Sequence, residues 1–398
     1  MKITDVMIKQ LSARFPDNST YYRYEQFGKR MIHPTDVYSK FNKQQSVVHC
    51  MPEGNSICHS FVEVLTDEGI TGVYGPIGNS TVLKYVKEFY APVVIGLDPL
   101  ATEYTWELMF RMSPRSYAGE QMFALSAVDN CLWDIRCKTF GVPLYRLLGG
   151  PTRDRIMAYA NCNGFSYEKG AVYETVKYLR DELGYKAIKW YAPFGPGSGN
   201  EGFRKNVELF ETLRSAAGDD MRIMIDAWSG WDIPYAQRIA KVMFELGFYF
   251  MEEPLMPAMA ESYLRLAVNS PVPVAFGENL FLRWGFKRFI DLAPGAFYQP
   301  DPEWCGGISE TQKIISLITA ADARMCMHAS STQLAAQMSL AAPACTVDMV
   351  EYLTTIAPTL QFFHKTRVEP IDGYIVMPDF VGTGHDYDES RAEKVEVW

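Results

Sequence analysis

Six short apolar segments between residues 221 and 353 each end at a single charged or titratable residue. Consecutive end residues are 26, 26, 23, 27 and 23 positions apart, and a gap of that length holds one strand, one helix and two loops. A strand that is buried on both faces of a sheet is a continuous apolar run, so apolar runs that alternate with helical segments indicate parallel βα units. The six end residues are Asp226, Glu252, Glu278, Asp301, His328 and Glu351.

Two earlier segments of the same kind bring the number of expected strands to eight. Residues 156–160 read IMAYA and residues 186–190 read KAIKW, with Lys189 near the end of the second. Eight parallel strands that alternate with helices predict an α/β fold with a (β/α)8-type barrel, in which the carboxyl ends of all strands meet at one rim. The six end residues and Lys189 should therefore face one cavity.

The chain is longer than a barrel requires. It has 398 residues, whereas a barrel takes about 250, so a second domain is expected. We predict an α+β capping domain over residues 1–125, completed by the C-terminal segment 371–398, and a catalytic barrel over residues 126–370. The expected elements of the capping domain are strands at 1–12, 61–65 and 70–74 and helices at 82–90, 100–112 and 120–140.

Composition excludes several classes of partner. The net charge is −9, which gives no electrostatic reason to bind nucleic acid or anionic lipid. No apolar run approaches the roughly 20 residues of a membrane span, and the first ten residues, MKITDVMIKQ, alternate like a strand and lack the apolar core of a signal peptide. The eight cysteines are scattered without a CxxC pair, as in a reducing compartment. A cytoplasmic enzyme with a small-molecule substrate is therefore expected.

Three of the end residues suggest a metal site. Asp226, Glu252 and Glu278 end three consecutive predicted strands, and three carboxylates side by side raise one another's pKa unless a cation lies between them. An all-oxygen ligand set favours Mg²⁺ over zinc. Taken singly, each carboxylate is more often a loop cap or an ion-pair partner, but three at one-unit spacing favour metal. Glu253, next to Glu252, should point away or into the barrel wall.

The remaining end residues suggest proton transfer. Asp301 and His328 can form a pair in which the carboxylate orients the imidazole and raises its basicity; the alternative is a core histidine satisfied by a carbonyl group. Lys189 can bind a carboxylate or move a proton, although a lone lysine near a strand end is usually a surface charge. Glu351, if protonated, can donate to a developing enolate, and is otherwise a rim charge. If a metal ion binds the carboxylate of a substrate, these residues are suited to removing the proton from the carbon next to that carboxylate.

The sequence resembles the enolase superfamily, mandelate racemase subgroup, over nearly its whole length. The resemblance implies Mg²⁺ on Asp226, Glu252 and Glu278, an Asp301–His328 dyad, a homo-oligomer, and a capping domain whose first long loop closes over the substrate. The segments that carry it are SFVEVLTDEGITGVYG, ALSAVDNCLWDIRCKTFGVPLYRLLGG, the three carboxylates, QPD followed by CGGI, MHASS and Glu351.

Within that subgroup, finer details of the chain resemble L-rhamnonate dehydratase and related acid-sugar dehydratases. The resemblance adds His33 of the capping loop, Tyr191 and Trp228 as substrate-binding residues. It implies dehydration of an aldonate to a 2-keto-3-deoxy acid through α-proton abstraction and β-elimination of water. The supporting segments are IHPTDVYSKF, KWYAPFGPGSGNEGFRKN, IDAWSGWDIPYAQRIA and YQPDPEWCGGIS.

One departure from the subgroup pattern separates the reactions. Many members have a Lys-x-Lys pair whose second lysine is a base, but this chain reads Lys189-Trp190-Tyr191. A racemase needs a base on each face of the substrate, whereas a dehydratase can use His328 as base and then as acid. Tyr191 can still serve as an acid, and Lys189 would neutralise the substrate carboxylate. The alternatives are an epimerase or cycloisomerase that uses the same metal-stabilised enediolate, and a barrel without catalysis that serves as a binding protein.

Overall fold

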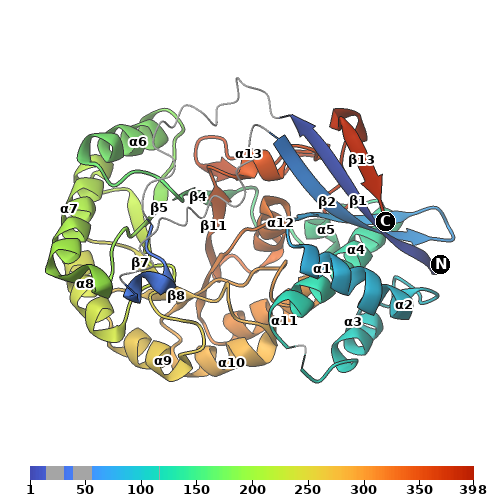
Figure 1. Ribbon diagram of the computed structural model, residues 1–398, viewed down its shortest axis with the longest axis horizontal. Coiled ribbons are helices and arrows are strands. Elements are labelled where there is room, and N and C mark those ends of the chain that lie inside the picture. Colours follow the sequence, from blue (N-terminus) through green and yellow to red (C-terminus); the bar gives the residue numbers. More distant parts are fainter. Residues whose placement is uncertain (15–30, 39–55, 116) are drawn as a thin grey trace.

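The protein is described by a computed structural model over residues 1–14, 31–38, 56–115 and 117–398. Eight parallel strands run in the order β4 to β11, and β11 pairs with β4, so the sheet closes (Figure 1). The predicted barrel is confirmed. Its strands are β4 (Ile156–Cys162), β5 (Ala187–Tyr191), β6 (Arg222–Asp226), β7 (Phe250–Glu252), β8 (Val274–Phe276), β9 (Phe297–Tyr298), β10 (Arg324–Met327) and β11 (Val347–Leu353).

Helices follow the strands in turn and form the outer ring of the barrel in Figure 1. Their inner faces are apolar at helical spacing, as in α8, which buries Ile239, Ala240 and Met243. Asp232 begins α8 by accepting the N–H of Tyr235, as an N-cap residue does. The helices are α6 (Lys169–Asp181), α7 (Gly199–Ala217), α8 (Ile233–Glu245), α9 (Ala260–Asn269), α10 (Leu282–Leu292), α11 (Gly307–Ala320), α12 (Thr332–Ala341) and α13 (Ala357–Leu360).

A layer of eight apolar side chains, one from each strand, fills the barrel interior. Side chains alternate between the two faces of a strand, so the next inward position on each strand lies two residues further along. That position is polar on seven of the eight strands and glycine on β8. The apolar layer consists of Tyr159, Ala187, Met224, Phe250, Ala275, Phe297, Cys326 and Met349.

A second, antiparallel sheet lies beside the barrel. The C-terminal strand β13 returns to pair with β1, so both ends of the chain contribute to this sheet (Figure 1). The strands expected at 61–65 and 70–74 are confirmed, and they pair as an antiparallel hairpin. The sheet order is β13 (Lys394–Val397), β1 (Ile3–Arg14), β2 (Ser56–Thr66) and β3 (Thr71–Ile77), and the neighbouring helical segments are α1 (Ser80–Lys84), the π-helical η5 (Tyr85–Tyr90), α2 (Ala91–Val94), α3 (Thr102–Arg111), α4 (Glu120–Phe140) and α5 (Leu144–Leu147).

The boundaries differ in part from those expected. The predicted division at residues 125 and 126 falls inside α4, and β12 (Tyr374–Ile375) of the C-terminal segment pairs with β4 of the barrel. The domain limits therefore stay a prediction. Helix α3 begins at Thr102 and not at residue 100, because Asp98 accepts the N–H of Leu100 in a turn that precedes the helix.

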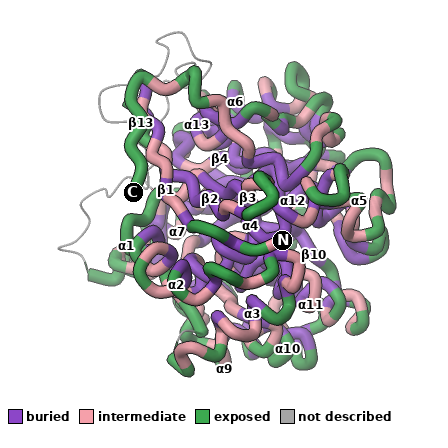
Figure 2. The backbone as a smooth tube through the Cα atoms, turned by 90° about the vertical axis from the view of Figure 1, so that its right-hand side faces the viewer, coloured by how far each residue is buried: buried purple, intermediate pink, exposed green. Residues whose placement is uncertain are grey.

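Helix α4 joins the sheet to the barrel. Gly72 of β3 lets the helix approach, because a methyl group there would lie 2.1 Å from the carbonyl oxygen of Cys131. On its other side, Asp129 and Asn130 accept the N–H groups of Ser309 and Ile308, at 2.9 and 3.0 Å. The first N–H groups of a helix have no partner within it, so α4 caps α11 from outside. Figure 2 shows long buried stretches in this region, whereas β13 is exposed along its length.

Two buried histidines lie between the sheet and α12. His364 donates from Nε2 to the carbonyl oxygen of Gly75 at 3.0 Å, and its Nδ1 lies 2.9 Å from Nε2 of Gln333, which donates to it. His385 contacts the hydroxyl groups of Ser331 and Thr383 at 2.8 and 3.0 Å. Burial lowers the pKa of His364 to about 4, and burial together with His364 lowers the pKa of His385 well below its ordinary value. Both side chains are therefore neutral in the folded protein.

The fold should consequently lose stability in mild acid. Because the folded-state pKa values are depressed, this contribution is complete above the unfolded-state pKa of about 6.5 and is lost as pH falls toward 4. We expect the free energy of unfolding to fall by about 1.4 kcal/mol per pH unit for each histidine below pH 6. Urea unfolding between pH 7.5 and 5 measures this dependence. The free energy of unfolding should fall less steeply with decreasing pH in His385→Gln than in the wild type. Identical slopes would contradict this assignment.

Candidate active site

The second inward layer of the barrel is a ring of buried polar side chains. It stands directly above the apolar layer, at the carboxyl ends of the strands, where the sequence predicted a cavity lined by titratable groups. Burial of so many ionisable groups is unfavourable unless they compensate one another, so their pairing determines the geometry of the site. The ring consists of Asn161, Lys189, Asp226, Glu252, Gln299, His328 and Glu351.

Lys189 is the cation at the centre of this ring. It is fully buried, and its Nζ lies 2.7 Å from Oε1 of Glu351 and 3.5 Å from Oδ2 of Asp226, and also contacts Glu252. Burial alone would lower the pKa of the ammonium group, but Glu252 and Glu351 raise it well above its usual value. Lys189 thus neutralises carboxylates of the protein itself from within the barrel, rather than standing at its mouth.

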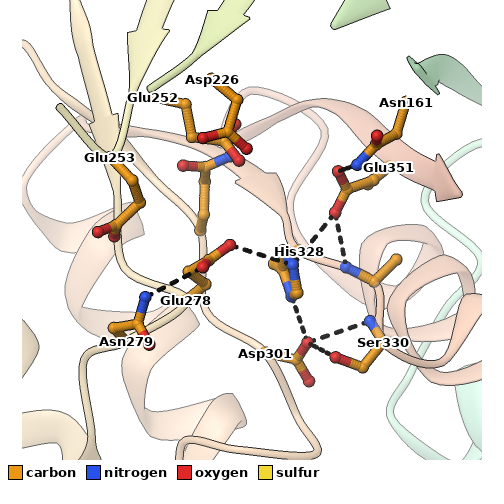
Figure 3. A network of polar contacts seen from close by, with 12 residues as sticks. Asn161, Asp226, Glu252, Glu253, Glu278, Asn279, Asp301, His328, Ser330 and Glu351 are labelled. Atoms are coloured by element: carbon orange, nitrogen blue, oxygen red, sulfur yellow. Dashed lines mark hydrogen bonds and ion pairs between the residues drawn. The ribbon is translucent and has the colours of Figure 1, made fainter. Parts of the chain in front are cut away.

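The three predicted metal ligands come from adjacent strands. Asp226 and Glu252 are partners in the β6–β7 register, and their side chains lie close together in Figure 3. Glu278 follows β8 and approaches Nε2 of His328 at 3.1 Å. Burial raises the pKa of Glu252 well above its ordinary value. Lys189 acts to lower this pKa, whereas the charges of Asp226 and Glu351 raise it further. Burial also raises the pKa of Glu278.

These three carboxylates are not gathered around one point. Among the described residues, no three His, Cys, Asp or Glu side chains form a group ready to hold a metal ion. Glu252 is turned toward Lys189 and toward Gln299, whose Nε2 donates to it at 2.6 Å. Each carboxylate therefore pairs with a cation or donor of the protein.

The donor chemistry nevertheless fits a hard divalent cation. The three side chains offer only carboxylate oxygens, from consecutive strands, in a site where burial raises the pKa values of Glu252 and Glu278. Oxygen ligands of this kind suit Mg²⁺. Asp226, Glu252 and Glu278 are the residues that would hold it.

His328 and Asp301 form the predicted pair. Nδ1 of His328 lies 2.5 Å from Oδ2 of Asp301, which also accepts from the Ser330 hydroxyl at 2.7 Å and the Ser330 N–H at 3.1 Å (Figure 3). The contact fixes the proton of the neutral ring on Nδ1 and directs Nε2 into the cavity. Burial would lower the pKa of His328, but Glu278, Glu351 and Asp301 together raise it well above its ordinary value.

Glu351 accepts hydrogen bonds at both of its oxygens. Oε1 accepts from Asn161 Nδ2 at 2.5 Å and from Lys189, and Oε2 accepts the N–H of Ala329 at 3.2 Å and lies 3.5 Å from His328 Nε2. Burial would raise the pKa of Glu351, but Lys189 and His328 lower it to about 2. The group is ionised in this arrangement, so it acts as an acceptor and does not offer the proton that donation to an enolate requires.

Glu253 points away from Glu252, as the sequence suggested. Its carboxyl group accepts from the Tyr263 hydroxyl at 3.0 Å and from the Gly277 N–H at 3.2 Å. Burial and then the charge of Glu278 raise the pKa of Glu253 to about 8. Figure 3 shows it apart from the Asp226–Glu252 pair.

The three residues expected to bind substrate lie at the same end of the barrel. The rings of His33 and Trp228 meet edge to face with centroids 5.3 Å apart, and Trp228 directly follows β6, where its N–H donates to Asp226. Tyr191 ends β5 and accepts from Asn161 at 3.3 Å. Burial and then Asp226 raise the pKa of Tyr191 well above its usual value, so its phenol stays protonated. The rest of the predicted capping loop from Phe15 to Lys43, apart from residues 31–38, lies outside the described residues.

Sequence reasoning missed four residues of the site. Asn161 holds Glu351 and Gln299 holds Glu252, while Ser330 binds Asp301 and the Trp304 ring lies 4.9 Å from the His328 ring. Asn161 and Gln299 occupy the positions two residues beyond the apolar layer, so a count along each strand would have found them. Both side chains are uncharged, whereas the prediction considered only charged or titratable residues at the ends of the apolar runs.

Comparison with known protein families agrees with this geometry. The family model described as "Enolase C-terminal domain-like" matches residues 171–391, and that of the "Mandelate racemase / muconate lactonizing enzyme, N-terminal domain" matches residues 44–149. The chain belongs to the enolase superfamily. Its place in the mandelate racemase subgroup, expected from the sequence, is confirmed.

Three proteins of similar sequence carry dehydratase or cycloisomerase names. A protein from Caldivirga maquilingensis, provisionally named L-rhamnonate dehydratase, is 34% identical over 274 residues, which are 68% of this chain and 65% of that relative. D-galactarolactone cycloisomerase from Agrobacterium fabrum is 30% identical over 82% of this chain and 88% of its own length. L-rhamnonate dehydratase from Saccharopolyspora erythraea is 32% identical over 68% and 67%, respectively.

The fold also matches a solved member of the superfamily. The crystal structure of rhamnonate dehydratase from Gibberella zeae complexed with Mg aligns over 98% of this chain and 95% of that one, with a TM-score of 0.83 and 24% identity. This likeness shows that the barrel and the capping sheet have the arrangement found in that structure. In the described part of the chain, no helix combines the length and apolarity needed to cross a membrane.

Proposed function

We propose that the protein is a Mg²⁺-dependent dehydratase that converts an aldonate resembling L-rhamnonate into a 2-keto-3-deoxy acid. The observation that carries the proposal is the Asp301–His328 pair, with Nε2 of His328 directed at Glu278, one of the three carboxylates that would hold the metal. The relatives from Caldivirga and Saccharopolyspora, with their dehydratase names, support the same reaction class.

Mg²⁺, when bound by Asp226, Glu252 and Glu278, would hold the substrate carboxylate and favour the negative charge that develops there when the α-proton leaves. The residues of the chain supply the remaining chemistry. Nε2 of His328 must be neutral to act as a base, which requires that substrate and cation replace its contacts with Glu278 and Glu351, since these raise its pKa. It then takes the C2 proton, and the resulting imidazolium donates that proton to the C3 hydroxyl, which leaves as water. The enol product tautomerises to the 2-keto acid.

The second position of the Lys-x-Lys pattern favours elimination over racemisation. Tyr191 occupies it, and its raised pKa keeps the phenol protonated, so no second base is available at that position. Lys189 is held by three carboxylates of the barrel. We propose that it keeps Glu252 and Glu351 in place and neutralises the site, with the substrate carboxylate as a further partner.

The function is tested by incubating purified protein with a panel of aldonic and aldaric acids, with Mg²⁺ or with EDTA, and measuring 2-keto acid formation. We expect one aldonate to yield keto acid only with Mg²⁺. A cycloisomerase is the second candidate, because the Agrobacterium relative covers 82% of the chain. Lactone consumption or deuterium exchange at C2 without keto acid would favour that candidate and overturn dehydration.

The proposed metal ligands can be tested by comparing a variant of Glu252 with the same variant of its neighbour Glu253. Replacing Glu252 with glutamine is expected to weaken Mg²⁺ binding at least about tenfold, because one of three carboxylate ligands is lost. Glu253→Gln is the matched control, since its carboxyl group is directed at Tyr263 and Gly277. Isothermal titration with Mg²⁺ measures both variants. An equal loss of Mg²⁺ affinity in the two variants, or no loss in Glu252→Gln, would refute the assignment of Glu252 as a ligand.

A further inference from the structure

Residues 31–38 of the capping loop lie directly on the barrel. The N–H of Ile32 donates to the carbonyl oxygen of Ala192, just beyond β5, at 2.9 Å. The Ile32 side chain is 1% exposed, and Pro34–Val37 form the short 3-10 helix η2. Removing an isoleucine side chain from water in this way favours the contact between the two parts of the chain. Ile32 therefore anchors this segment.

Three glycines receive the segment, and they do so because a side chain would not fit. A methyl group on Gly230 would lie 2.2 Å from Cγ1 of Ile32, one on Gly195 would lie 2.5 Å from its Cδ1, and one on Gly197 would lie 2.4 Å from the carbonyl oxygen of Asp36. Gly195 has a φ of −143°, a conformation open to any residue. These glycines, here called the glycine seat, serve close approach. Gly195 and Gly197 follow β5, and Gly230 follows β6.

The seat fixes the residue next to Ile32 in a defined orientation. His33 caps η2: its Nδ1 accepts the Thr35 N–H at 3.1 Å, and its own N–H donates to Asp36 at 3.2 Å. With Nδ1 an acceptor, the ring proton of the neutral histidine is on Nε2. The rings of His33 and Trp228 meet edge to face, and the backbone N–H of Trp228 donates to Asp226. A continuous series of contacts thus leads from the seat to the proposed metal site.

We propose that Ile32 and the glycine seat are positioning elements that hold His33 and Trp228 at the carboxyl end of β6 and so set the affinity for the hydroxyl-bearing part of the substrate. Ile32 acts through His33 and makes no contact with the reacting carbons. The substrate part of this inference rests on the proposed function, whereas the seating of the segment does not. If seating is lost, only the seated fraction binds normally, and the apparent affinity falls in proportion.

The test is a size-exchange cycle of Gly230→Ala, Ile32→Ala and the double variant, with Ile32→Val as the conservative change. Gly170→Ala is the matched control, because a methyl group there has no neighbouring atom within 4 Å. Two experiments are made: amide hydrogen exchange of residues 31–38, and steady-state kinetics that give KM and kcat with the sugar acid that the panel identifies. The exchange measurement needs no substrate.

Gly230→Ala and Ile32→Ala should each accelerate exchange of residues 31–38 at least tenfold. They should raise KM about tenfold or more, with kcat changed less than threefold. The double variant should regain part of the protection lost in Gly230→Ala, because the methyl group then occupies space vacated by Ile32. Ile32→Val and Gly170→Ala should stay close to the wild type.

Unchanged exchange in both Gly230→Ala and Ile32→Ala would overturn the seat. Faster exchange with unchanged KM would overturn its role in affinity. If no sugar acid is turned over by the wild type, the proposed function fails while the exchange data still decide whether the seat holds the segment. If Gly230→Ala does not fold, Ile32→Ala against Ile32→Val decides both points.

Discussion

Replacing His328 with asparagine should reduce turnover of the sugar acid by at least about 10³-fold while leaving substrate binding within a few-fold of the wild type. Proton transfer by a positioned side chain contributes about 10²–10⁴-fold, and in the proposed reaction His328 serves both in removing the proton and in protonating the leaving hydroxyl. The asparagine amide can still donate to Asp301, now 2.5 Å from the ring, so the loop should keep its structure. Keto acid formation and calorimetric binding of the substrate measure the two effects.

His59→Asn is the control for this change, because it makes the same replacement on β2, outside the site. It should retain turnover. Near-normal turnover in His328→Asn would refute the assignment of His328 as the base. Loss of binding together with turnover would instead assign it to holding the substrate.

Replacing Lys189 with methionine should cost about 3–5 kcal/mol of unfolding free energy, measured by urea unfolding in EDTA. Removal of one partner from a buried ion pair leaves an uncompensated charge, and measured losses of this kind fall in that range. Lys189 is the cation shared by Glu351, Glu252 and Asp226, and methionine has a similar length without the charge. Added Mg²⁺ should reduce the loss if it binds the same carboxylates.

Lys205→Met is the matched control, since Lys205 pairs with Glu201 at 3.0 Å on the surface of α7. Exposed pairs of this kind contribute little to stability, so this variant should unfold almost like the wild type. Equal losses in the two lysine variants would show that the buried charges compensate one another without Lys189.

The sequence predicted the barrel and most of the polar ring because both follow from local rules. Apolar runs mark buried strands, and the residue that ends a run lies at the rim, which placed Asp226, Glu252 and His328 correctly at the carboxyl ends of β6, β7 and β10. The partners of these groups depend on the stagger between neighbouring strands and on side-chain rotamers. The sequence alone therefore did not indicate that Lys189 is enclosed by carboxylates, nor that Glu278 turns to His328.

The seating of residues 31–38 shows a second limit of sequence reasoning. Gly195 and Gly197 after β5 receive Ile32 and Asp36, which lie far earlier in the chain. Local propensity carries no information about which distant residue fills a space. The start of α3 shows the same limit at short range, because Asp98 accepts the N–H of Leu100 in a turn before the helix begins.

The capping of α11 by α4 has a consequence for how the chain assembles as it is synthesised. Asp129 and Asn130 leave the ribosome long before residues 308 and 309, whose N–H groups they bind. Until then, two polar side chains on a helix with mostly buried faces lack their final partners, and burying them would be unfavourable. Helix α4 therefore cannot settle fully until most of the barrel has been made, and the sheet beside it is completed only when β13 has emerged and reaches β1.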